Sequence, residues 1–166
     1  MSEQQSYSPP TPGPFHEKLQ PFAGTFRAKV TIWFGPDQTH ESTGTMNSSW
    51  QLDGLHLAQD YAGDATEGPF PSFEGKGYWS YNNCSNEYVG FWIDNASPIP
   101  QVETGSVDQA GKVWTMHCEV PNPHAGGLMK KKTIITLIDN DHHTMQSFVD
   151  TDQGEFKNMQ IEYTRA

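Results

Sequence analysis

Cysteine is scarce in this chain of 166 residues, and long apolar segments are missing. The two cysteines, Cys84 and Cys118, are too few for a disulfide framework or a cysteine-rich zinc site, so we expect two free thiols. No apolar run approaches the roughly 18 residues that a membrane helix needs, and the polar N-terminus lacks the apolar stretch of a signal peptide. We therefore expect a cytoplasmic protein without a membrane partner.

Positive charge is scarce as well. The chain has 10 lysines and arginines against 20 aspartates and glutamates, which gives a formal net charge of −10. An acidic surface repels a phosphate backbone, so a nucleic-acid partner is not expected. The one basic run, Lys130–Lys132, is typical of a solvated strand end rather than of a phosphate site.

Leucine occurs at only six positions, whereas aromatic residues make up 12% of the chain. A helical bundle needs more leucine than this, and aromatic residues favour strands. From Gly24 onward the apolar residues recur with a period of two, which predicts a half-buried strand. The residues that share its apolar face are Phe26, Ala28, Val30, Ile32 and Phe34.

About ten such segments follow one another, separated by turn signals such as Asp53-Gly54. Such a series of strands forms either a sandwich or a barrel. Consecutive hairpins favour an all-β, antiparallel up-and-down barrel of about ten strands, because closure removes exposed sheet edges. Gly75 and Gly77 within one strand predict a bulge or a sharp bend. The side chains expected inside the barrel include Phe26, Val30, Ile32, Trp50 and Leu57.

The N-terminal region differs from the rest in composition. Residues 1–14 are rich in proline and serine and are expected to form a flexible extension. Residues 15–166 are expected to form one barrel domain. Pro14 suits the first turn of a helix, which predicts a short helix near His16–Gln20 that covers one end of the barrel.

Several short segments occur in an order that is typical of a known family. They are Leu19-x-x-Phe22-Ala23-Gly24-Thr25-Phe26, Trp50-Gln51-Leu52-Asp53-Gly54, Tyr61-Ala62-Gly63, Phe73-Glu74-Gly75-Lys76-Gly77-Tyr78, Trp92-Ile93-Asp94 and Ile161-Glu162-Tyr163-Thr164-Arg165. Together they resemble the bacterial family catalogued as domain of unknown function 1579, from about His16 to the C-terminus. The resemblance implies a calycin-like (lipocalin-like) barrel and no particular activity. Phe26 stands where the family pattern has tryptophan, and Arg165 is expected to close the barrel by stacking near Phe26.

The seven histidines do not form a recognisable metal motif, and no metal or cofactor is expected. The opening His16-x-x-Leu19 also resembles that of haem barrels of the nitrobindin type, which carry a proximal histidine on a late strand. The last predicted strand, 156–165, has no histidine, which argues against haem. His142 and His143 lie at a predicted turn and are expected in solvent.

Aromatic residues at strand positions are the strongest indication of a site. Either they pack a solid core, or several of them line a cavity for a small hydrophobic molecule, since buried tyrosine and tryptophan keep a polar tip. The second hypothesis predicts a binding pocket with Asp94 near its mouth. The candidate ligand-binding residues are Trp50, Tyr61, Trp79, Tyr88, Trp92, Asp94 and Tyr163.

Two other functions remain open at this point. No nucleophile elbow, cysteine–histidine pair with catalytic flanks or phosphate loop is present, so an enzyme would depend on a cavity acid or base, Asp94 or His117. A structural or dimerisation module would instead use Trp33, which interrupts the polar face of the first strand and could meet a second copy of the chain.

Overall fold

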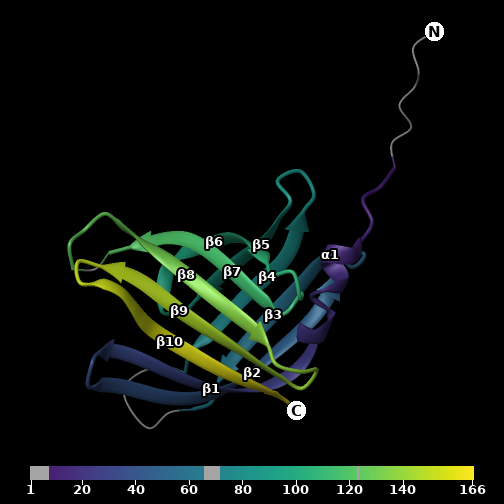
Figure 1. The fold of residues 1–166 in the computed structure, drawn as a ribbon. Helices are drawn as coiled ribbons and strands as arrows, with labels where there is room; N and C mark the ends of the chain where they lie inside the picture. The colour runs from purple at the N-terminus through teal and green to yellow at the C-terminus, as the bar shows by residue number, and fades with distance from the viewer. Residues whose placement is uncertain (1–7, 66–71, 123) are drawn as a thin grey trace.

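The computed structural model describes residues 8–65, 72–122 and 124–166. Ten antiparallel strands form a closed barrel in which each strand pairs with its sequence neighbours and the last pairs with the first (Figure 1). The strands are β1 (Gly24–Gly35), β2 (Gln38–Gln51), β3 (His56–Gly63), β4 (Glu74–Asn82), β5 (Glu87–Asp94), β6 (Ser97–Val107), β7 (Val113–Pro121), β8 (Leu128–Leu137), β9 (His142–Thr151) and β10 (Gly154–Arg165). The predicted all-β barrel is confirmed.

A short helical segment covers one end of the barrel. It consists of α1 (Pro14–Glu17) and the 3-10 helix η1 (Gln20–Phe22), in place of one helix near His16–Gln20. Pro14 starts α1 as expected, and Leu19 and Phe22 are 0% and 4% exposed against the barrel core. None of the helices in the described part of the chain has the length and apolar character that a membrane crossing needs. Residues 1–7 of the expected N-terminal extension lie outside the described residues.

The two ends of the barrel differ. Figure 1 shows α1 at one end, called the helix end below, and the β1–β2 and β9–β10 connections at the opposite end, called the far end. At the far end the register of β1 and β2 shifts between Trp33 and Gly35, and Phe34 is 70% exposed. The expectation that Phe34 continues the inward face is therefore wrong, because a bulge ends the alternation there. Trp33 is partly buried, and the Lys157 ammonium lies 4.5 Å from the centre of its ring.

Most of the inward alternation predicted for the strands is confirmed. Phe26, Val30 and Leu57 are buried, and Ile32 and Trp50 are partly buried against the core. One apolar cluster lies beneath the helical segment and consists of Leu19, Phe22, Leu57, Tyr81, Tyr88, Trp114, Met116 and Ile135. A second cluster follows β1, β2, β3 and β10 and consists of Phe26, Ala28, Val30, Met46, Tyr61, Ile161 and Tyr163.

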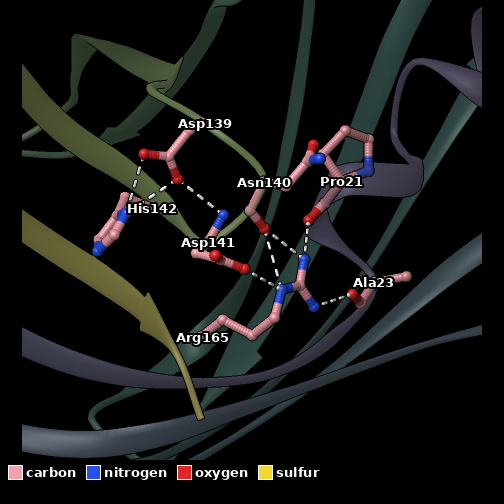
Figure 2. Close-up of polar contacts among 7 residues, drawn as sticks. All are labelled: Pro21, Ala23, Asp139, Asn140, Asp141, His142 and Arg165. Atoms are coloured by element: carbon pink, nitrogen blue, oxygen red, sulfur yellow. Dashed lines mark hydrogen bonds and ion pairs between the residues drawn. The ribbon is translucent and has the colours of Figure 1, made fainter.

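Arg165 fastens the helical segment to the barrel (Figure 2). Its guanidinium donates hydrogen bonds to the carbonyl oxygens of Pro21, Ala23 and Asn140, each at 2.7–3.0 Å. Its Cζ lies 4.4 Å from the centre of the Phe26 ring, the stacking that the resemblance to lipocalin-like barrels implied. The two cysteines, as expected, are free thiols.

Candidate functional site

The interior of the barrel is filled at the helix end and partly open toward the far end. Inward-facing residues beneath α1, such as Leu57 and Trp114, are 0% exposed. Inward-facing residues nearer the far ends of β5 and β6, such as Trp92 and Gln101, remain partly exposed although they point into the barrel. Solvent therefore reaches the interior from the far end, which makes that part of the barrel the candidate site.

Trp92 is the ring that the fold positions most specifically in this region. Its indole lies against the wall over Gly75 and Gly77, and a Cβ on Gly77 would come within 2.7 Å of the ring. The indole N–H donates a 2.9 Å hydrogen bond to Asp94, whose other oxygen accepts bonds from the backbone of the turn that follows. The two glycines thus make room for Trp92. Along these described residues β4 and β5 pair without a register shift, so the structure shows no bulge at the two glycines.

Tyr61 and Tyr163 form a second group of predicted site residues. Tyr61 lies over Gly44, where a Cβ would come within 2.8 Å of the backbone of Ala62. Both tyrosines are 5% exposed. Burial raises the pKa of both hydroxyls, and for Tyr163 the neighbouring Tyr61 adds to the rise, so both stay protonated at neutral pH.

Trp50, Trp79 and Tyr88 lie apart from these, at the helix end. The Trp50 indole donates to the Gln20 side chain at 2.7 Å, and the Tyr88 hydroxyl donates to the Phe15 carbonyl at 3.0 Å. Trp79 packs on the same apolar cluster and lies over Gly90. The seven predicted residues therefore occupy three places inside the barrel, and those nearest the open region are Trp92 and Asp94.

A group of polar side chains points into the barrel beside Trp92, and we call it the polar cluster. Its members are Gln101 and Glu103 on β6, Cys118 on β7, and Lys131 and Thr133 on β8. The Lys131 ammonium donates to Glu103 at 2.7 Å and to Gln101 at 2.8 Å. The side chains of this ion pair are only 16% and 15% exposed. Removing two charges from solvent costs free energy that their attraction and further hydrogen bonds have to offset.

The remaining members add hydrogen bonds to one oxygen of Glu103, Oε1. The Thr133 hydroxyl donates to Glu103 Oε1 at 2.9 Å, and the Cys118 sulfur lies 3.7 Å from the same atom. Burial and the adjacent Glu103 carboxylate raise the pKa of the Cys118 thiol to about 11. Cys118 is therefore a protonated, unreactive thiol rather than a nucleophile.

The barrel wall is open next to the polar cluster. β6 pairs with β7 only over Thr104–Val107, so among the described residues its first part, 97–103, pairs with β5 alone. Pro98 and Pro100 lie in this part and have no N–H to donate. A depression of about 390 Å³ lies in the gap. Some of the residues that line it are at strand positions facing the barrel interior, and others are at positions facing outward. One of the inward residues is Gln101, which is also bonded to Lys131.

Comparison with known proteins agrees with this architecture. A family model described as a protein of unknown function (DUF1579) matches residues 11–165. The chain belongs to this family. Among solved structures, the S-type phycobiliprotein lyase CPES from Guillardia theta is similar at 12% identity, with 90% of this chain and 91% of that chain covered and a TM-score of 0.64. Rv2717c from M. tuberculosis is similar at 14% identity, with coverage of 93% and 98% and a TM-score of 0.66. A search of curated sequences finds no significant match.

The polar cluster of this DUF1579 protein was missed at the level of sequence. Lys130–Lys132 was expected to be a solvated run, but only Lys130 and Lys132 point outward. Lys131 is two and four residues before the buried Thr133 and Ile135 and therefore shares their face of the strand. This alternation could have indicated that Lys131 points inward. Glu103 alternates in the same way with Gly105, which pairs with Tyr88 inside the barrel.

The histidine predictions for this DUF1579 protein are also corrected. His117 is exposed and has the opposite parity to the buried Trp114 and Met116, so it cannot serve as a cavity acid or base. His143 was expected in solvent but is 6% exposed inside the barrel, stacked on Tyr163 at 4.4 Å. Within the described residues its Nδ1 has no hydrogen-bonding partner. Among these residues no group of three or more potential ligands is placed to hold a metal ion.

Burial of His143 predicts a dependence of stability on pH. Desolvation and, to a smaller extent, the charge of Arg165 lower the pKa of His143 from 6.5 to about 4. Between these values the unfolded chain binds a proton that the folded chain does not, so stability is complete above about pH 6.5 and falls by up to about 1.4 kcal/mol per unit as the pH drops toward 4. The pKa of His16 is lowered too, in the same direction.

Urea unfolding at pH 7, 6 and 5 measures this effect. The chain is expected to lose stability across the series, and His143→Phe should reduce the slope because phenylalanine suits the surrounding rings and does not titrate. His117→Phe, on the exposed outer face, serves as the control and should leave the slope unchanged. Equal slopes for the native chain and His143→Phe would contradict the prediction.

Proposed function

We propose that this protein binds a small, largely apolar molecule in the part of the barrel interior that opens toward the far end. The observation that carries the proposal is the partial exposure of inward-facing residues there, Trp92 above all, while the helix end is filled. An apolar lining with a few polar groups is typical of small-molecule sites.

Trp92 supplies the main apolar contact in this proposal. Gly75 and Gly77 keep its ring flat against the wall, and Asp94 fixes the ring by its hydrogen bond. The Asp94 carboxylate is occupied by the Trp92 indole and by two backbone N–H groups, which favours a positioning role over a catalytic one. Tyr61 and Tyr163 are proposed as further lining residues, whose protonated hydroxyls would offer hydrogen bonds to the molecule.

The fold comparison agrees with a binding role. One structure of similar fold is named as an S-type phycobiliprotein lyase, which supports a binding role for a barrel of this architecture. Family membership adds no activity, because the family itself is of unknown function.

Titration with a neutral hydrophobic dye, 1-aminoanthracene, tests the proposal. Binding should change both the dye fluorescence and the intrinsic tryptophan emission. Trp92→Phe should weaken the affinity about tenfold, equivalent to about 1.4 kcal/mol of lost ring contact. The matched control is Trp50→Phe, which removes an equally inward but helix-end tryptophan and should alter the affinity less than about twofold.

Two outcomes would overturn this function. If no hydrophobic probe changes fluorescence or the melting temperature, the binding function fails. If Trp50→Phe weakens binding as much as Trp92→Phe, the site does not lie at the far end. Gel filtration of the native protein in the same buffer then tests the alternative, in which the chain acts as a dimerisation module.

A further inference from the structure

We propose that the polar cluster recognises an uncharged amide-like group of the bound molecule, one that carries an N–H beside a C=O, and that this group enters through the gap between β6 and β7. The inference rests on the proposed function and specifies the chemistry of its ligand. It assigns a binding role to Gln101, Glu103, Lys131 and Thr133.

Among the described residues, the hydrogen bonds of the Lys131–Glu103 ion pair leave one donor of Lys131 and one oxygen of Glu103 without a partner. An ammonium group has three N–H bonds, and Lys131 uses two of them, on Gln101 and on Glu103 Oε1. Glu103 Oε1 accepts from both Lys131 and Thr133, whereas Oε2 has no hydrogen-bond donor among the described residues. A free N–H of Lys131 and a free oxygen of Glu103 thus lie side by side inside the barrel.

This pair matches the two halves of an amide. The C=O of the ligand would accept from Lys131, and its N–H would donate to Glu103 Oε2. The charges of Lys131 and Glu103 cancel, so an uncharged group is favoured, whereas a carboxylate would meet the negative charge of Glu103 and lose its own hydration.

The position of the cluster makes it reachable. Gln101 both lines the depression of about 390 Å³ in the wall and accepts a hydrogen bond from Lys131, so this one side chain connects the depression with the ion pair. Ser147 pairs in register with Thr133, and its buried hydroxyl has no partner within the described part of the chain. A further polar group of the ligand could satisfy this hydroxyl, because buried polar atoms are nearly always hydrogen-bonded.

Competition between two probes of the same chain length tests the inference. Decanamide and decanoate are titrated against bound 1-aminoanthracene at pH 7.5. We expect decanamide to bind about tenfold more tightly than decanoate, since the site pairs an amide and disfavours a second carboxylate. The double variant Glu103→Leu/Lys131→Met keeps the volume of both side chains but removes the donor and the acceptor, so it should bind decanamide about tenfold more weakly than the native protein does.

A matched pair on the outer face provides the control. Lys132, the next residue along β8, forms an outward ion pair with Glu155, and Lys132→Met/Glu155→Leu should keep the preference for decanamide. If native protein binds decanoate as tightly as decanamide, or if the inner double variant binds decanamide as tightly as the native protein does, this inference is overturned while the binding function stands. If the dye itself does not bind, the proposed function fails first.

Discussion

Gly105→Ala is expected to lower the free energy of unfolding by about 3 kcal/mol, as severe overpacking does. Gly105 lies on β6 between Tyr88 of β5 and Met116 of β7. A Cβ at this position would overlap the Thr115 carbonyl oxygen and come within 2.8 Å of the Met116 Cα. Both obstacles are backbone atoms, so a side-chain rotation cannot relieve the clash, and the short β6–β7 ladder has to separate.

Gly90→Ala is the matched control for this change. Gly90 also faces the interior, on the neighbouring strand β5, but the nearest atom to its Cβ would be the Trp79 indole nitrogen at 3.5 Å, an ordinary contact. This variant should stay within about 1 kcal/mol of the native protein, since alanine also reduces the entropy of the unfolded chain. Urea unfolding followed by circular dichroism measures both. Equal stability of the two variants would show that β6 and β7 do not approach each other as closely as the structure places them.

Lys131→Met is expected to cost about 3 kcal/mol, because it leaves the Glu103 carboxylate uncompensated in the interior. Glu103 would keep only the Thr133 hydroxyl and the weak Cys118 thiol as donors. Replacing both charges, in Glu103→Leu/Lys131→Met, should restore stability to within about 1 kcal/mol of the native protein, because an apolar pair of similar volume removes the desolvation cost as well as the attraction.

Lys132→Met separates this effect from the general loss of a lysine. The Lys132–Glu155 pair lies on the outer face, with 29% and 43% of the side chains exposed, and its loss should cost less than about 1 kcal/mol. Urea unfolding of the four proteins gives the comparison. If Lys131→Met proves as mild as Lys132→Met, the inner pair is solvated and the interior is wetter than the exposed fractions indicate.

Strand alternation and turn signals were enough to predict the architecture from the sequence. The inward positions of Phe26, Val30 and Leu57 follow from a period of two, which depends only on the local backbone. The stacking of Arg165 on Phe26 was predicted from the resemblance to lipocalin-like barrels and not from the periodicity. The prediction that Phe34 faces the interior was wrong because a bulge ends the inward–outward alternation before it. The periodicity of a single strand does not reveal such a bulge.

The tertiary structure alone decided how the inward residues are distributed. Which face a residue takes is local, but its height along the barrel axis and its neighbour across the interior depend on the stagger of ten strands. Trp50 and Trp92 therefore look equivalent in sequence, although one seals the helix end and the other lies in the open region. Lys131 meets Glu103 only because β6, β7 and β8 align at that height. His143 is buried because rings from three elements surround it: Phe22 of η1, Phe26 of β1 and Tyr163 of β10, with ring centres 4.4–5.0 Å away.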